Sequence, residues 1–197
     1  MTNFKYAAFI SYRHLPLDAE VAKQVQHAIE TYRVPRGTQS PAGFKGGQAL
    51  GNCFRDEDEL SAAHSLPQHI TEALEQSSAL VVVCSPETAK SAWVLREIET
   101  FIEMHGRDRV FVVLAEGSPS ECIPEILRHQ TVVDIDGKER VIPSEPLAAD
   151  FRKEAASKRA DETLRLLASI IGCGYDDLRQ RQRARSEEHT SELQSRI

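Results

Sequence analysis

Two short runs of consecutive apolar residues restrict the fold of this chain more than any other feature of its sequence. Residues 79–84 (ALVVVC) and 109–115 (RVFVVLA) are almost entirely apolar and rich in β-branched side chains. A strand without alternating polar positions has no face for water, so both runs are typical of strands in a parallel sheet that is covered on both faces. We therefore expect an α/β protein.

Amphipathic segments alternate with these apolar runs. Val21, Val25 and Ile29 recur at intervals of four, which predicts one face of a helix. Helices are expected over residues 17–32, 66–76, 91–105 and 163–171, and strands over residues 6–12, 53–54, 79–84, 109–115 and 131–135. This order favours a central five-stranded parallel sheet with helices on both faces, in which ligands bind beyond the carboxyl ends of the strands.

Composition narrows the class of protein further. A chain of 197 residues can bury a core without disulfides or metals, and a formal net charge of −6 argues against a general nucleic-acid binder. The sequence contains neither a membrane-length apolar stretch nor a signal peptide, so a cytoplasmic location is expected. The four cysteines, which form no C-x-x-C pair, are expected to be reduced: Cys53, Cys84, Cys122 and Cys173.

Several α/β families are excluded because the motifs that they carry are missing from this sequence. The turn after the first strand carries no G-x-G-x-x-G, and the chain contains neither a P-loop nor a G-x-S-x-G elbow. A receiver-type phospho-acceptor would need acidic residues where residues 11–13 (SYR) and 84–86 (CSP) stand. The histidines form no ligand-like set with the cysteines, although His64 and His69 are five apart, so no metal is expected.

Four ordered motifs do match a known family. They are residues 9–13 (FISYR), 54–60 (FRDEDEL), 83–86 (VCSP) and 91–97 (SAWVLRE). Together they resemble the Toll/interleukin-1 receptor (TIR) domain in its bacterial form, over about residues 5–135. The resemblance implies a flavodoxin-like five-stranded sheet in which a long loop around the second strand, the BB loop, borders a nucleotide site. The loop of residues 36–52 is itself unusually long, and such loops are usually functional or mobile.

The resemblance also implies a reaction. Enzymatic members cleave the bond between nicotinamide and ribose in NAD, and their catalytic glutamate follows a tryptophan by four positions, as Glu97 follows Trp93 here. Residues i and i+4 share one helical face, so the indole and the carboxylate should be neighbours. The leaving nicotinamide becomes neutral and needs no general acid, so one carboxylate can suffice where ordinary glycosidases need two.

Substrate contacts are implied at the strand ends. Arg13 and His14 take the positions that meet the nucleotide, and the planar fork of Arg13 suits a pyrophosphate, although an arginine is frequent where His14 stands. Asp56 and Asp58 would meet the nucleotide's hydroxyls. The expected substrate-binding residues are Ser11, Arg13, His14, Phe54, Arg55, Asp56, Asp58 and Trp93. Glu99 and Glu103 are expected on the solvated face of the same helix.

Two functions remain open. The first is a NAD+ glycohydrolase that takes NAD+ as substrate rather than cofactor, releases ADP-ribose or a cyclic form of it, and is activated by self-association in antiphage or cell-death signalling. The second is a non-catalytic TIR interaction module. The Pro-Gly turn of receptor-type members is replaced by residues 61–64 (SAAH), which weakens the case for adaptor-style pairing.

The C-terminal part divides the chain into three expected segments. Residues 1–145 form the TIR domain, residues 146–184 form a helical extension, and residues 185–197 are excluded from the fold. The segment RSEEHTSELQS at residues 185–195 resembles a translated sequencing adapter. The four arginines at residues 179–185 would suit the cytoplasmic flank of a membrane anchor in a longer native chain.

Overall fold

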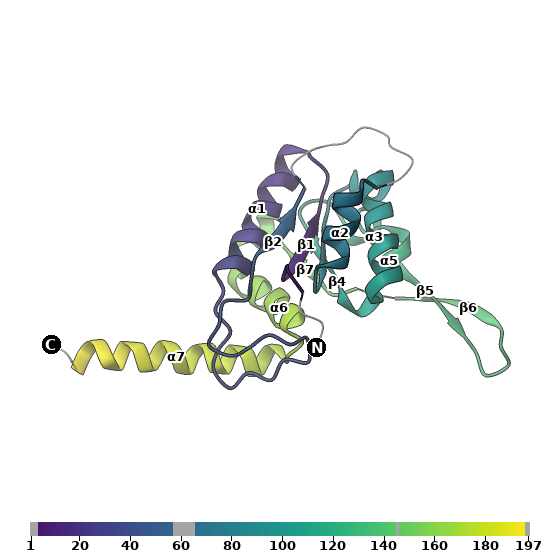
Figure 1. The fold of residues 1–197 in the computed structure, drawn as a ribbon. Coiled ribbons are helices and arrows are strands. Elements are labelled where there is room, and N and C mark those ends of the chain that lie inside the picture. Colours follow the sequence, from purple (N-terminus) through teal and green to yellow (C-terminus); the bar gives the residue numbers. More distant parts are fainter. Residues whose placement is uncertain (1–3, 57–65, 145, 196–197) are drawn as a thin grey trace.

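Five parallel strands form the central sheet of the protein. The computed structural model describes residues 4–56, 66–144 and 146–195. The sheet has the order β2-β1-β3-β4-β7 (Figure 1). Its strands are β1 (Ala8–Ser11), β2 (Cys53–Arg55), β3 (Leu80–Cys84), β4 (Val110–Leu114) and β7 (Ala148–Asp150). This is the flavodoxin-like order, so the expected fold class is confirmed.

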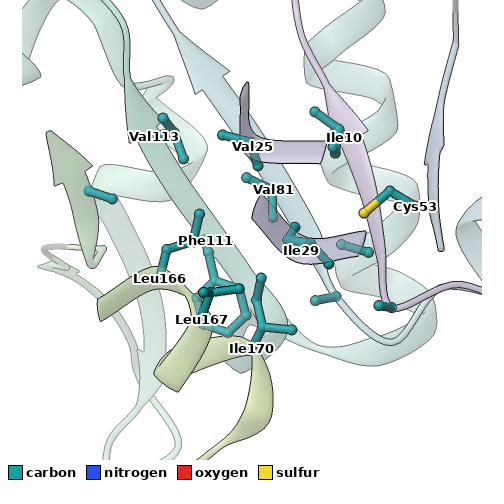
Figure 2. Packing of buried hydrophobic residues seen from close by; sticks show 14 of the residues in the cluster. Ile10, Val25, Ile29, Cys53, Val81, Phe111, Val113, Leu166, Leu167 and Ile170 are labelled. Atoms are coloured by element: carbon teal, nitrogen blue, oxygen red, sulfur yellow. The ribbon is translucent and has the colours of Figure 1, made fainter. Parts of the chain in front are cut away.

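Helices cover both faces of this sheet. On one face lie α1 (Pro16–Thr31) and α6 (Arg159–Ile171), and on the other lie α2 (Gln68–Glu75) and α3 (Ala92–His105). Successive side chains of β3 alternate between the two: Val81 and Val83 face α1 and α6, whereas Val82 faces α2 and α3. Figure 2 shows the first of these layers, where residues of α1 and α6 pack over the sheet: Val25, Ile29, Leu166, Leu167 and Ile170.

The helices expected from the sequence are confirmed within a few residues of their predicted ends. Ser91 caps α3 by accepting a hydrogen bond from the backbone N–H of Val94 over 3.3 Å. Helix α6 ends at Gly172, whose φ of 79° is left-handed and therefore favours glycine. The short helices are 3₁₀ turns at Thr88–Lys90, Arg107–Arg109 and Lys153–Lys158, together with α4 (Pro119–Cys122) and α5 (Glu125–Arg128).

The prediction that residues 131–135 form the fifth strand of the central sheet is wrong. The strand that forms there, β5 (His129–Val133), pairs with β6 (Glu139–Pro143) in a separate antiparallel hairpin that projects from the body (Figure 1). A turn at Asp134 and Gly137, in which the Gly137 N–H donates to the Asp134 carbonyl over 3.0 Å, folds the chain back before it can join the sheet. The edge position beside β4 is taken by β7.

The sheet continues across the boundary expected at residue 145. Strand β7 completes it, and α6 supplies buried residues to the core. The last helix, α7 (Tyr175–Ser195), reaches the same core through Leu178, which is fully buried. In the part of the chain that the structure describes, no helix combines the length and apolar composition needed to cross a membrane.

The long loop of residues 36–52 lies at the amino end of the strands. Helix α1 runs back along the sheet, so the loop that follows it begins at the opposite end from the carboxyl edge (Figure 1). The Ser40 hydroxyl donates to the carbonyl of Ile171 at the end of α6 over 2.6 Å, and Arg181 of α7 donates to the Arg36 carbonyl over 3.4 Å. This loop therefore does not border the carboxyl edge, where the family's nucleotide site is expected.

Candidate active site

A buried carboxyl group lies at the carboxyl edge of the sheet. Glu97 of α3 is 2% exposed, and both of its oxygens accept hydrogen bonds. The Ser11 hydroxyl donates to Oε2 over 2.5 Å, and the Trp93 indole Nε1 donates to Oε1 over 3.0 Å. The expected neighbourhood of Trp93 and Glu97 is therefore confirmed, and Ser11 joins them from β1.

Alternation along β1 explains how Ser11 reaches this carboxyl. Ile10 faces α1, whereas Phe9 packs on the α2 and α3 side, so Ser11 also projects toward α3 at the end of the strand. Glu97 shares the buried face of α3 with Val94 and Phe101. Glu99 and Glu103 are exposed, as predicted for the opposite face.

Burial dominates the electrostatics of Glu97. Desolvation raises the pKa of its carboxyl to about 8, against the hydrogen bonds from Ser11 and Trp93, which favour the charged form, while the negative charge of Asp56 raises the pKa further. At neutral pH the carboxyl is therefore mostly protonated in the ligand-free protein. A cation placed beside it would stabilise the carboxylate and release the proton.

Tyr12 ties the ends of β1 and β2 together. Its hydroxyl donates to the Asp56 carbonyl over 2.8 Å and accepts a hydrogen bond from Arg55 Nη1 over 3.0 Å. The rings of Tyr12 and His14 have centroids 4.8 Å apart. Four predicted residues, Ser11, His14, Arg55 and Asp56, are thus joined to Tyr12 or Glu97 at one edge, whereas the predicted Asp58 lies outside the described residues.

Arg13 lies near a second buried carboxyl. Burial raises the pKa of Asp18, while a hydrogen bond from Ser85 and the positive charge of Arg13 act in the opposite direction. Lys90 and, more weakly, Arg13 lower the pKa of Glu87. The guanidinium predicted to meet a pyrophosphate therefore already acts on the charge of two acidic side chains.

Phe54 is partly buried and packs against the core. Its ring stacks on Phe9 with centroids 5.2 Å apart and meets the edge of Tyr6 at 5.5 Å. Because Phe54 and Arg55 are successive residues of β2, their side chains point to opposite faces of the sheet. The structure thus gives Phe54 a packing contact on the α2 and α3 side, and its predicted contact with substrate stays a prediction.

The described residues include neither a cluster of metal ligands nor a cysteine whose thiol pKa is lowered. Within the residues described, no three His, Cys, Asp or Glu side chains are grouped so that they could hold a metal ion. Burial raises the pKa of Cys53 to about 12 and also raises that of Cys84, so both thiols stay protonated at neutral pH.

Tyr12, Asp18 and Ser85 are not among the substrate-binding residues expected from the sequence, although Ser85 lies in the third motif. Tyr12 stands inside the first motif, and Asp18 shares the helical stripe of Val21 and Val25. A carboxylate on an otherwise apolar stripe was the signal that could have identified Asp18, because a buried acid needs a partner.

Comparisons with known proteins identify the family of this chain. A family model described as TIR domain matches residues 47–153, which is more than half of the chain. The NAD(+) hydrolase ApTIR of Actinoplanes sp. is 36% identical over 113 residues, which make up 57% of this chain and 14% of that protein. The chain therefore spans only a small part of this curated relative.

Solved structures give a weaker match. The TIR domains in the structure of the activated Roq1 resistosome directly recognizing the pathogen effector XopQ are 24% identical, with a TM-score of 0.42, over 58% of this chain and 60% of that one. The family match rests on the sequence itself and takes in β2, α2, β3, α3, β4 and β7. The chain belongs to the TIR domain family.

Proposed function

We propose that this chain is a NAD+ glycohydrolase that breaks the bond between nicotinamide and ribose, with Glu97 as the catalytic residue. The observation that carries the proposal is the buried Glu97 carboxyl, held by Ser11 and Trp93 at the carboxyl edge of the sheet. The 36% identity to a protein named NAD(+) hydrolase supports it.

The proposed chemistry needs one carboxylate. The bond between ribose C1′ and the pyridinium nitrogen breaks, and its electron pair leaves with nicotinamide, which becomes neutral. Positive charge then develops on the ribose, where a carboxylate stabilises it. Water adds to C1′ and loses a proton to solvent, which gives ADP-ribose; attack by a nucleophile of the substrate itself would give a cyclic form.

The environment of Glu97 suits this step. NAD+ brings a positive pyridinium, which would lower the pKa of the carboxyl from about 8 and leave it ionised where charge develops. Because Glu97 is almost fully buried, its charge would be poorly screened by water and its attraction to the ribose cation correspondingly strong. Ser11 and Trp93 hold both oxygens, so little reorganisation is needed.

We propose that NAD+ binds at the rim of the carboxyl edge of the sheet. The half-buried Trp93 offers an indole face to the nicotinamide ring while its N–H is occupied by Glu97. Asp56 would accept hydrogen bonds from ribose hydroxyls, with Asp58 beside it in sequence. Arg13, His14 and Arg55 provide donors for the pyrophosphate.

The proposal includes activation by self-association. The hairpin of β5 and β6 carries apolar side chains in water: Val133 is 66% exposed, Val141 is 67% exposed and Ile135 is fully exposed. Exposed apolar side chains of this kind are suited to contacts between proteins. Assembly through this hairpin would link neighbouring chains in a signalling or defence response.

The test is turnover of NAD+ over a range of protein concentrations. The expected result is release of nicotinamide and of ADP-ribose, or its cyclic form, in equal amounts, with specific activity rising as the protein associates. The alternative is a non-catalytic TIR interaction module. Association by light scattering without any nicotinamide release at any concentration would favour that alternative and contradict the enzyme.

A further inference from the structure

A second carboxyl is buried at the carboxyl edge, on the opposite face of the sheet from Glu97. Asp18 lies in the first turn of α1, is 1% exposed, and accepts a hydrogen bond on Oδ2 from the Ser85 hydroxyl over 2.8 Å. The charges of Arg13 and Glu116 also act on it. Burying a carboxyl is unfavourable unless it is hydrogen-bonded, so the contact with Ser85 offsets part of the cost of burying Asp18.

Ser85 is the first residue of the connection from β3 to α3, and buried polar groups link that connection along its length. The Ser85 N–H donates to Thr88 Oγ1 over 2.9 Å, and Thr88 Oγ1 donates to the Val83 carbonyl over 3.2 Å. The Ser91 N–H donates to the Thr88 carbonyl over 3.0 Å. The Ser91 hydroxyl in turn caps α3 at Val94.

These contacts join Asp18 to the start of the helix that carries the proposed catalytic pair. Ser91 is the N-cap of α3, Trp93 lies in its first turn, and Glu97 lies one turn further on. We infer that Asp18 is a positioning residue, which acts through Ser85 and Thr88 to fix the start of α3 and so the placement of Trp93 and Glu97. The inference rests on the proposed function, and it assigns Asp18 no contact with substrate.

Burial of the linking residues makes their hydrogen bonds costly to lose. The four linking residues, Asp18, Ser85, Thr88 and Ser91, are all buried, so water cannot readily replace a lost partner. Loss of the Asp18 acceptor would leave the Ser85 hydroxyl with only its 3.3 Å contact to Thr88 Oγ1, so the hydroxyl would reorient and the turn would be held less firmly. A displacement of about 1 Å at a catalytic group can lower a rate by about 100-fold.

The test compares Asp18→Ala and Asp18→Asn with Glu20→Ala, a change at an exposed position of the same helix. Steady-state kinetics with NAD+, the fluorescence of Trp93 and the thermal midpoint are measured on each. Asp18→Ala is expected to lower kcat at least about 10-fold with KM changed less than about 2-fold, and to shift the Trp93 emission. Asp18→Asn keeps an acceptor oxygen for Ser85 and should recover most of both signals.

Substitutions further along the connection from β3 to α3 provide a second test if Asp18→Ala does not fold. Should Asp18→Ala fail to fold, Ser85→Ala and Thr88→Val each remove one link and should give the same pattern of kcat loss and emission shift. Folded variants with wild-type kcat and wild-type Trp93 emission would overturn the inference, as would an Asp18→Asn protein no better than Asp18→Ala. Absence of turnover in the wild type would refute the proposed function alone, because the Trp93 emission still reports on positioning.

Discussion

Trp93 and Glu97 stand one turn apart on α3 and are joined by a hydrogen bond of 3.0 Å from the indole Nε1 to the carboxyl Oε1. Trp93 is the only tryptophan of the chain. Its fluorescence therefore reports directly on the charge of the carboxyl that we propose to be catalytic.

A fluorescence titration should follow the ionisation of Glu97. Burial raises the pKa of this carboxyl to about 8, so the Trp93 emission is expected to change with a midpoint near that pH as negative charge appears beside the indole. The Glu97→Gln protein should lack this step. Emission of the wild type that stays constant from pH 6 to 10 would argue against the raised pKa.

The pH dependence of catalysis should show the same group. The carboxylate is the active form, so kcat/KM for NAD+ is expected to rise with pH and to level off above about pH 8, since kcat/KM reports the free enzyme. The profile of kcat should reach its plateau at a lower pH, because bound pyridinium favours the carboxylate. A kcat/KM profile that is flat between pH 6 and 9 would contradict this assignment.

Stability should respond to Glu97 in the opposite direction. The pKa of Glu97 in the folded protein, about 8, lies above its ordinary value of 4.5. The free energy of unfolding is therefore unaffected by its ionisation below pH 4.5 and falls as the pH rises from 4.5 toward 8. The loss is at most about 1.4 kcal/mol per pH unit. Glu97→Gln cannot ionise, so its free energy of unfolding should gain on the wild type between pH 5 and 8 in denaturant titrations. A difference that does not vary with pH would count against burial of the charge.

Removal of residues 185–197 should leave the fold intact. Helix α7 reaches the core through Leu178, ahead of the segment whose sequence resembles an adapter. The free energy of unfolding of a chain ending at Ala184 is expected to lie within about 0.5 kcal/mol of that of the full chain. Leu178→Ala should lower the free energy of unfolding by about 2–5 kcal/mol. A truncated chain as unstable as Leu178→Ala would show that the tail belongs to the fold.

The sequence predicted those parts of the fold in which one element carries its own signal. Strands β3 and β4 are recognisable because burial on both faces makes them uniformly apolar. Strand β7 is only Ala-Ala-Asp and has no pattern of its own; its place beside β4 depends on the hairpin that precedes it. The stronger local pattern at residues 131–135 therefore predicts a strand of the central sheet, whereas these residues form part of a separate hairpin.

The candidate site divides in the same way. Trp93 and Glu97 were predictable neighbours because the period of one helix relates them. Ser11 meets Glu97 across 86 residues, and Asp18 meets Ser85 across 67, because the sheet topology brings these segments to one edge. Neither pair has a signal in local spacing. The motif likewise gives no sign that the ring of Phe54 stacks on Phe9 of the neighbouring strand.

Release of nicotinamide from NAD+ by Glu97→Ala tests the central claim most directly. The wild type and Glu99→Ala, which changes an exposed carboxylate two residues away on the same helix, are measured beside it at the concentration of greatest activity. Nicotinamide release is expected to fall at least about 100-fold in Glu97→Ala and to stay at the wild-type rate in Glu99→Ala. A folded Glu97→Ala protein that releases nicotinamide at the wild-type rate would contradict it.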